Sequence, residues 1–267
     1  MPSGKDQQVL TDIERDPDQT EAHQRIVFLD TPFDRIDAQT ALNRLAASSA
    51  GAPFRYVVTP NANHVVRLNQ TPELRPLYDA AWMSLCDSKP IHIFARARSL
   101  VLPHATGSDL TAQLFKAVIK PGDRLALIVA NAAVGEQLQA AYPDLDLRVY
   151  VPPMGLLTNA QAQKGCVDFV VDAKARFVFL AVGAPQSEKV AYLLSRQPGA
   201  TGVGLCIGAS LEFLVGAKQR APQWMQRLSL EWLHRIATDP GRLWKRYAFD
   251  TLPLLKLFAQ EMRKGAS

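Results

Sequence analysis

Short apolar runs alternate with helical patterns over most of this chain. The runs that read as buried strands are Ile26–Leu29, Tyr56–Val58, Met83–Cys86, Leu125–Ala130, Leu147–Val151, Phe177–Val182 and Gly202–Ile207. Between most of them, apolar residues recur at helical spacing, over residues 37–48, 63–69, 72–81, 109–119, 133–142, 159–171 and 186–195. Alternation of this kind predicts an α/β fold, with a mostly parallel sheet and helices on both faces.

Local sequence marks several helix starts. Thr71-Pro72-Glu73 places a capping residue before a proline at the first helical position and an acid in the first turn. Ser108-Asp109 marks another start.

After Gly208 the pattern becomes helical only, with helices expected at residues 210–216, 222–237, 240–248 and 251–263. We therefore divide the chain into a disordered acidic leader (1–24), an α/β core that would carry the catalytic residues (25–209) and a helical appendage (210–267).

The net charge of +5 hides a polarity along the chain. Residues 1–40 carry nine acids and four bases, whereas residues 218–267 carry ten Lys or Arg and four acids. The basic end also holds Trp224, Trp232 and Trp244. Such a tail is typical of a segment that binds an anionic partner, whether a lipid surface, a phosphate or a nucleic acid. The alternatives are a solvated surface and helices packed on the core.

Other features bound the compartment and the chemistry. Three scattered cysteines without a CxxC pair favour a reducing compartment over a disulfide framework or a zinc site. The polar, acidic start has no signal-peptide pattern, and no apolar stretch is long enough to span a bilayer, so we expect a cytoplasmic protein, soluble or peripheral. The sequence has no GxGxxG after a strand, no phosphate-binding GxxxxGK[ST], no HExxH and no DxD pair. We therefore expect catalysis without a dedicated metal site or cofactor.

Polar residues follow two of the predicted strands. Thr59 and Asn61 come directly after one apolar run, with Asn63 two residues further on, and Asp87 follows another. Ligands bind at the carboxyl ends of strands in parallel sheets, so these residues are candidates for one pocket in which Asp87 acts as a general base. The alternatives are that Asp87 caps a helix that Pro90 helps to start, and that Thr59 and Asn61 are turn residues around Pro60. His64 is either a pocket residue or a surface group at a helix start.

Two further blocks suit an anion. Thr106-Gly107-Ser108-Asp109 offers backbone N–H groups and hydroxyls at a helix start, where a diphosphate would bind, although the same residues can simply cap the helix. Gly183-Ala184-Pro185-Gln186-Ser187-Glu188 follows a strand and opens a helix, and its glycine permits a close backbone approach to a nucleotide phosphate.

Taken together, these blocks resemble the WecG/TagA/CpsF glycosyltransferase family. The matching stretches are Val57–Asn61, Asp87, Thr106–Leu110, Gly183–Pro185, Gly208–Phe213, Arg220–Met225, Leu230–Leu233 and Pro240–Leu243. The resemblance runs from about residue 26 to 250, nearly the whole folded part.

The resemblance implies a Rossmann-like core and an inverting, metal-independent hexosyltransferase. It implies a UDP-sugar donor, carrying N-acetylmannosamine, its uronic acid or glucose, and a polyprenyl-diphosphate-linked sugar acceptor at the inner face of a bacterial membrane. The pathway would be that of a surface polysaccharide or exopolysaccharide. Asp87 would be the base, Thr59 and Asn61 would line the active site, and Arg220 and Arg227 would meet the diphosphate. A homo-oligomer is compatible with these features.

Three positions depart from the family pattern. Many members have Asp-Gly where this chain has Asp87-Ser88-Lys89, an arginine where it has His104, and Lys-Gln-Glu where it has Gln186-Ser187-Glu188. Lys89 would face a diphosphate, an acidic sugar or solvent, and His104 would be a weaker, pH-dependent replacement for arginine. These departures bear on the donor more than on the reaction type.

Two other functions remain open at this point. One is a non-catalytic module that binds anionic lipid or nucleic acid through the basic, Trp-rich tail. The other is a nucleotide-dependent enzyme with a soluble substrate. A simple binding module has no need of Thr59, Asn61 and Asp87 together, which favours the enzyme.

Overall fold

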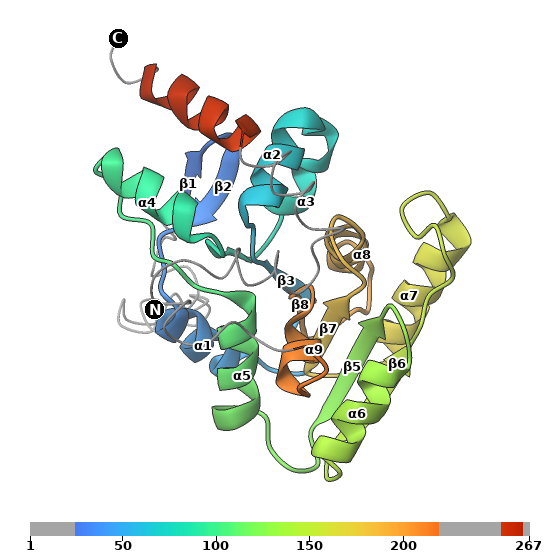
Figure 1. Cartoon of the computed structure of the whole chain (residues 1–267). Helices are drawn as coiled ribbons and strands as arrows, with labels where there is room; N and C mark the ends of the chain where they lie inside the picture. Colours follow the sequence, from blue (N-terminus) through green and yellow to red (C-terminus); the bar gives the residue numbers. More distant parts are fainter. Residues whose placement is uncertain (1–24, 219–251, 264–267) are drawn as a thin grey trace, which may run out of the picture.

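The computed structural model describes residues 25–218 and 252–263, and its centre is a six-stranded sheet (Figure 1). The strands lie in the order β4-β3-β8-β7-β5-β6, and every neighbouring pair is parallel. Their bounds are β3 Arg55–Val58, β4 Met83–Ser84, β5 Arg124–Val129, β6 Asp146–Tyr150, β7 Phe177–Ala181 and β8 Val203–Cys206. The predicted mostly parallel α/β fold is confirmed.

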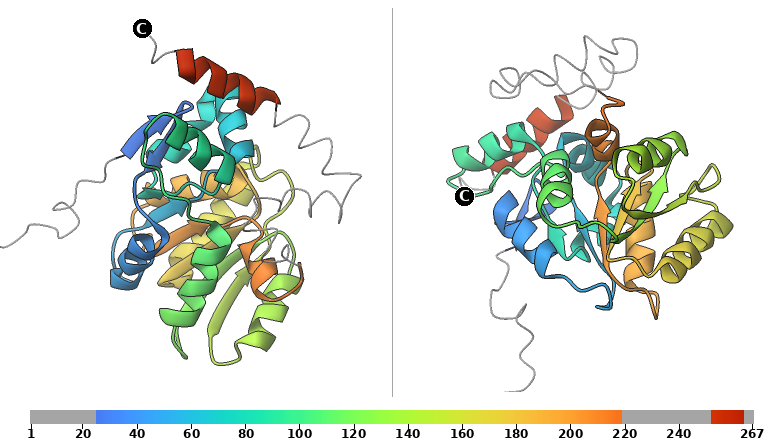
Figure 2. Two further views of the ribbon diagram at one scale, coloured as in Figure 1. Left: turned by 60° about the vertical axis from the view of Figure 1, so that its left-hand side comes forward. Right: turned by 90° about the horizontal axis from the view of Figure 1, so that it is seen from below.

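Helices cover both faces of this sheet (Figures 1 and 2). Their bounds are α1 Ala38–Ala47, α2 Ala62–Gln70, α3 Pro76–Asp79, α4 Lys89–Ala97, α5 Gly107–Ala117, α6 Ala133–Ala141, α7 Ala160–Ala173, α8 Gln186–Ser195 and α9 Ser210–Leu214, with a 3-10 turn at Pro72–Leu74 and a further helix at 252–263.

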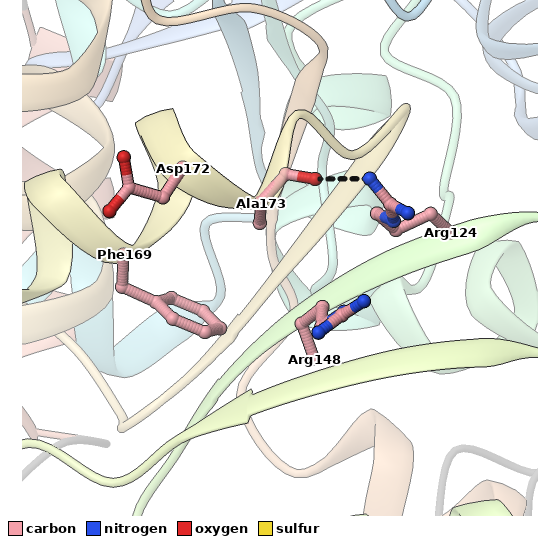
Figure 3. Close-up of a pocket in the computed structure, with 5 residues that line it drawn as sticks. All are labelled: Arg124, Arg148, Phe169, Asp172 and Ala173. Atoms are coloured by element: carbon pink, nitrogen blue, oxygen red, sulfur yellow. Dashed lines mark hydrogen bonds between the residues drawn. The ribbon is translucent and has the colours of Figure 1, made fainter.

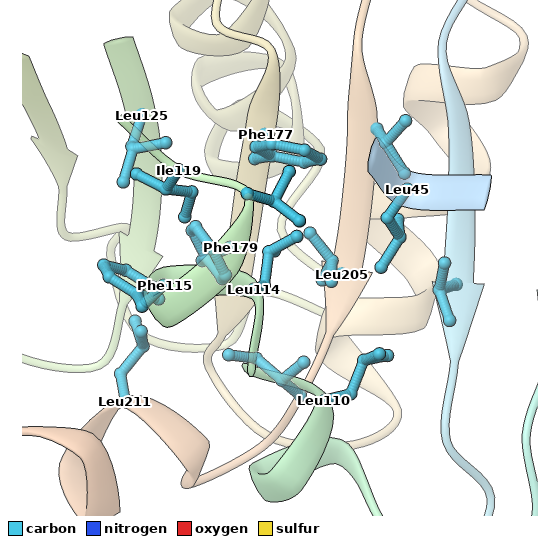
Figure 4. Close-up of a cluster of buried hydrophobic side chains, with 14 of the residues drawn as sticks. Leu45, Leu110, Leu114, Phe115, Ile119, Leu125, Phe177, Phe179, Leu205 and Leu211 are labelled. Atoms are coloured by element: carbon cyan, nitrogen blue, oxygen red, sulfur yellow. The ribbon is translucent and has the colours of Figure 1, made fainter. Parts of the chain in front are cut away.

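Alternating side chains of each strand enter two separate cores. In β7, Phe177 and Phe179 join the cluster under α1, α5, α6 and α9, whereas Val178 and Leu180 join the cluster under α3, α7 and α8. Figure 4 shows the first cluster, in which Leu114 of α5 lies among the strand residues. Burial on both faces explains why the strands read as continuous apolar runs.

The first apolar run does not enter this sheet. It forms β1 (Arg25–Phe28), which pairs antiparallel with β2 (Thr31–Asp34). β2 was not predicted from the sequence. The buried Asp34 accepts hydrogen bonds from Arg25 at 2.8 Å and from the Ser84 N–H at 2.7 Å, and so connects the hairpin to β4.

The hairpin, α2, α4 and the helix 252–263 enclose a third core. Phe258 stacks on Phe94 of α4 with ring centroids 4.0 Å apart, and Leu254 is buried beside them. Figure 2 shows this helix in red beside α4. The expected helices at 210–216 and 251–263 are therefore present as α9 and residues 252–263. The leader at 1–24 and the expected helices at 222–237 and 240–248 lie outside the described residues.

Several predicted helix boundaries were wrong. Residues 72–81 form a 3-10 turn and the short α3 instead of one helix, because Pro76 starts a new turn, and the Thr71 side chain makes no capping hydrogen bond. α5 begins at Gly107, two residues before the predicted start, because Thr106 rather than Ser108 is its cap. α4 was not among the predicted helical patterns, and only the capping alternative for Asp87 implied a helix at this place. Within the described residues, no helix has the length and apolar character needed to cross a bilayer.

The Gly202-Val203-Gly204 sequence at β8 serves packing. Gly202 has a φ of +90°, and a Cβ there would collide with the Ala175 carbonyl oxygen. A Cβ on Gly204 would lie 2.6 Å from the Phe54 ring. Both glycines thus let β8 pass close to neighbouring elements.

We expect Gly202→Ala to lower the free energy of unfolding by about 2–4 kcal/mol, because it combines a strained φ with a backbone collision. Gly51→Ala is the matched control, since a Cβ at Gly51 would have no heavy atom within 4 Å. Urea denaturation of both variants measures the effect. A Gly202→Ala protein as stable as the control would contradict this account of β8.

Candidate active site

A cavity of about 560 Å³ lies at the carboxyl ends of β3, β5, β7 and β8. Its walls also include the loop after β4 and the starts of α2, α5, α8 and α9. Of the residues predicted from the sequence, those that line it are Thr59, Asn61, Asn63, Asp87, Thr106, Ser108, Gly183 and Glu188.

Asp87 connects the loop after β4 to the start of α5. Its Oδ2 accepts a hydrogen bond from the Gly107 N–H at 3.0 Å, and its own N–H donates to the Pro60 carbonyl at 3.0 Å. Asp87 is not the cap of α4, because Ser88 takes that position and accepts from the Ile91 N–H. The carboxylate is therefore fixed at the cavity wall rather than used to end a helix.

Thr59 lies directly after β3 and is 5% exposed. Its hydroxyl donates to the Cys206 carbonyl at 3.3 Å, across the junction between β3 and β8. A Cβ on Gly107 would approach the Thr59 Oγ1 to 3.1 Å, so the glycine allows α5 to begin against β3. The start of α5, Thr59 and Asp87 are thus close together.

The start of α2 is closed by a reciprocal cap. Asn61 accepts hydrogen bonds from the N–H groups of Asn63 at 3.0 Å and His64 at 3.3 Å, while His64 Nδ1 accepts from the Asn61 N–H at 3.4 Å. Asn61 is therefore both the cap of α2 and a cavity residue. His64 also lines the cavity, half-buried, rather than lying on the surface.

Thr106 caps α5 and is bonded to Asp109. Its Oγ1 accepts from the Asp109 N–H at 3.0 Å and donates to Asp109 Oδ2 at 2.6 Å. This exchange holds the Asp109 carboxylate against the cap and outside the cavity lining. The hydroxyls of Thr106 and Ser108 remain at the cavity wall, 3.4 Å apart.

α8 begins after Gly183, whose φ is +83°, and a cis Ala184–Pro185 bond. Ser187 is buried, and its hydroxyl donates to the Leu180 carbonyl at 3.0 Å. Glu188 lies in the first turn, 2% exposed, and its Oε2 has no hydrogen-bond partner among the described residues. Burial raises the pKa of Glu188 to about 7. The backbone N–H of Glu188 and the positive charge of Arg67 lower this pKa, but their effect is smaller than that of burial.

Arg67 of α2 was not predicted as a site residue. Its Nη1 donates to the Ala184 carbonyl at 2.5 Å, and its Nη2 donates to Asn63 Oδ1 at 3.4 Å. The side chain therefore joins α2 to the loop before α8 and contributes a positive charge to the cavity. The spacing of Asn63 and Arg67, four residues apart on one helix, is the signal that the sequence offered.

Other predicted residues lie outside the cavity lining. Lys89 is the first residue of α4, and His104 is exposed, with its ring 6.4 Å from that of His92. Pro185 and Gln186 are at the start of α8 and are not among the residues that line the cavity. Gly107 contributes its backbone N–H to Asp87. Arg220 and Arg227 lie outside the described residues.

Further lining residues come from β5 and α9 and were also not predicted. They include Asn131, which follows β5, and a pair near α9 in which Lys218 donates to Glu212. Phe213 adds an aromatic ring to this side. Among the described residues, no group of three His, Cys, Asp or Glu side chains is placed to hold a metal ion.

A smaller hollow, of about 270 Å³, lies near the amino end of β5 (Figure 3). Its arginines already have partners: Asp146 binds Arg124 at 2.6 Å and Arg148 at 3.0 Å, and Arg124 also donates to the Ala173 carbonyl at 3.4 Å. The hydrogen bond from Arg124 lowers the pKa of Asp146. The hollow thus belongs to a surface ion-pair network.

Comparison with known proteins identifies the family of the chain. The sequence model of the glycosyl transferase WecG/TagA/CpsF family matches residues 26–267. Over 163 residues the chain is 40% identical to the N-acetylglucosaminyldiphosphoundecaprenol N-acetyl-beta-D-mannosaminyltransferase of Bacillus subtilis (strain 168). That alignment covers 59% of this chain and 60% of the relative, so the chain spans less than two thirds of the relative's length. The resemblance drawn from the sequence blocks is confirmed, and the chain belongs to the glycosyl transferase WecG/TagA/CpsF family.

Proposed function

We propose that the protein is an inverting glycosyltransferase that moves a hexosyl group from a UDP-sugar to a polyprenyl-diphosphate-linked sugar in the synthesis of a bacterial surface polysaccharide or exopolysaccharide. The transferred group is N-acetylmannosamine, its uronic acid or glucose. The observation that carries the proposal is the fixed Asp87 carboxylate in a cavity bordered by several helix N-termini. The family and the name of the Bacillus relative support the substrate classes.

In the proposed reaction, Asp87 takes the proton from the acceptor hydroxyl. The acceptor oxygen forms a bond to the anomeric carbon, and the bond from that carbon to the diphosphate oxygen breaks on the opposite face. One such displacement inverts the anomeric configuration and releases UDP. The Gly107 N–H bonds to Asp87 Oδ2 and so holds the carboxylate at the cavity wall, where it can take a proton from the acceptor.

The leaving diphosphate gains negative charge as the glycosidic bond breaks. α2, α5 and α8 begin beside the cavity, and the positive ends of their dipoles stabilise that charge. Arg67 adds a full positive charge at the same cavity. These groups account for leaving-group stabilisation by the protein's own residues, in keeping with a metal-independent transferase.

The acceptor lipid places the reaction at a membrane surface, and we propose a peripheral location on its cytoplasmic face. α4 and the helix 252–263 support this, because they expose the apolar residues Ile93, Leu252 and Leu255 and carry bases such as Lys256. Membership of a transferase family favours this enzyme over the non-catalytic binding module. The Trp-rich tail on which that alternative depended lies outside the described residues.

We expect Asp87→Asn to lower kcat by about 100-fold or more, because the amide cannot accept the acceptor proton but can still accept the Gly107 hydrogen bond. Asp168→Asn is the matched control, since Asp168 lies in an exposed ion pair with Lys164 on α7. UDP release measures the rate, and circular dichroism confirms the fold. Full activity in Asp87→Asn would remove Asp87 from the mechanism.

The whole reaction is tested by incubating the purified protein with short-chain polyprenyl-diphosphate-linked N-acetylglucosamine or glucose and a set of UDP-sugars. We expect UDP release and a product one hexosyl unit heavier than the acceptor, with one donor preferred. Proton NMR of the product reports the anomeric configuration. Retention of configuration would contradict the single displacement, and the absence of product with every pair would contradict the proposed transfer.

A further inference from the structure

Glu188 is a buried carboxyl that the proposed reaction does not use. Its side chain is 2% exposed yet borders the cavity, and Oε2 has no hydrogen-bond partner among the described residues. A buried polar oxygen without a partner costs free energy of folding, so such groups are uncommon unless a ligand satisfies them. Because the Glu188 side chain borders the cavity, the bound substrate is the nearest source of such a partner once the side chain turns to present this oxygen.

Arg67 provides the complementary group. Its guanidinium is held by the Ala184 carbonyl and Asn63, and its charge acts on the Glu188 carboxyl. No hydrogen bond nevertheless joins Glu188 Oε2 to Arg67 in the described part of the chain. An acceptor and a donor are therefore fixed at one end of the cavity without satisfying each other. A hydroxyl fits this arrangement, because it donates one hydrogen bond and accepts another.

The order of the strands shows which part of the donor lies at this end. Thr59 follows β3 and Asp87 follows β4, at one side of the cavity. Val129 of β5 and Val134 of α6 lie at the other side. The strands β8 and β7 lie between these two sides. The apolar β5 side suits a planar nucleobase. The β3 side holds Asp87, beside which the anomeric carbon must lie. α8 packs against β3 as well as β7 and β8, and the loop at its start is bonded to Arg67 of α2, the helix that follows β3. Glu188 therefore belongs to the side of the transferred sugar.

We propose that Glu188 and Arg67 recognise one hydroxyl of the transferred sugar, which donates to Glu188 Oε2 and accepts from Arg67, and so determine which UDP-sugar is used. This inference rests on the proposed function. A sugar that lacks this hydroxyl, or carries it in the other configuration, would leave both buried groups without partners. Sites built to bind a hydroxyl reject such analogues strongly.

The surroundings of Glu188 set its charge. The titratable groups that face it are Arg67 from α2, Tyr56 from β3, Tyr78 from α3 and Cys206 from β8. Burial raises the pKa of each of the last three, so they are neutral at physiological pH, and Arg67 is the charge that acts on Glu188. Burial raises the pKa of Glu188 itself to about 7. The protein thus carries this carboxyl partly protonated at neutral pH.

This burial has a consequence for stability. In the folded protein Glu188 keeps its proton up to about pH 7, whereas in the unfolded chain it loses the proton near the ordinary pKa of 4.5. The contribution of Glu188 to the free energy of unfolding therefore falls as the pH rises from 4.5 to 7. We expect the Tm of Glu188→Gln, relative to the unchanged protein, to increase from pH 5 to pH 8. Glu136→Gln, at an exposed first-turn position of α6, is the matched control and should show no such trend. A pH-independent Tm difference for Glu188→Gln would contradict a buried, ionising Glu188.

Binding measurements test the proposed contact itself. Isothermal titration with UDP, UDP-glucose and UDP-N-acetylmannosamine gives the ratio of the Kd of each UDP-sugar to the Kd of UDP. We expect Glu188→Met, which keeps the length of the side chain but removes both oxygens, to raise this ratio about tenfold for the preferred donor. Glu188→Gln keeps an acceptor oxygen and should recover most of the loss. Glu136→Met is the control.

An unchanged ratio in Glu188→Met, or an equal loss of UDP and UDP-sugar binding, would overturn the assignment, since a merely structural residue behaves in the second way. Product formation by the unchanged protein tests the transferase proposal separately. Product from the unchanged protein with an unaltered binding ratio in Glu188→Met would overturn this inference alone. A raised ratio without product from any acceptor would support the sugar contact while contradicting the proposed transfer.

Discussion

The pairing of β3 with β8 is the contact on which the cavity depends. The register places Val58 beside Cys206, so the chain leaves both strands at the same point of the same edge. The Thr59 hydroxyl then reaches the Cys206 carbonyl, although 147 positions separate the two residues in sequence. Because parallel strands direct their carboxyl ends to one edge, the loops after β4 and β7 are brought to the same place. A slip of one residue in this pairing would turn Thr59 away from the cavity.

The cavity places two carboxyl groups close to the site proposed for an anionic substrate. Its proposed substrate carries a diphosphate, and yet Asp87 and Glu188 both line the wall. Three features limit this repulsion: Asp87 accepts a backbone N–H, Glu188 is partly protonated near neutral pH, and Arg67 carries a positive charge at the same wall. The raised pKa of Glu188 thus reduces the cost of placing a second carboxyl near an anionic ligand.

Sequence patterns predicted the elements whose formation is local. Apolar runs identified the strands of the central sheet because both faces of that sheet are buried. β2 was missed because Pro32 and Asp34 interrupt its apolar pattern. The buried Asp34 carboxylate is satisfied by partners that are not local in sequence, Arg25 and the Ser84 N–H. The predicted helix at 72–81 failed because Pro76 permits only a new turn there.

The cavity was predictable in part, because some of its residues follow directly after predicted strands. Residues at strand ends, such as Thr59 and Asp87, are placed there by topology alone, and the structure brings them together. Arg67 was not predictable in this way, because its partner is the Ala184 carbonyl, 117 residues away. The sequence also left open whether Asp87 caps a helix. The answer depends on a group that is distant in sequence, because the Asp87 carboxylate accepts its hydrogen bond from the Gly107 N–H.

The departure from the family pattern at Ser187 gains a physical meaning from these contacts. Where many members have glutamine, this chain has a serine that is buried and bonded to the Leu180 carbonyl, so its hydroxyl is already used. The short Ser187 side chain of α8, bonded to a carbonyl of the preceding strand β7, cannot replace a long amide at the cavity. Of the residues that line the cavity beside this turn, Glu188 and, from α2, Arg67 carry the charged groups. On our proposal, the recognition of a sugar hydroxyl at the start of α8 therefore falls in this chain to a carboxyl and a guanidinium rather than to an amide.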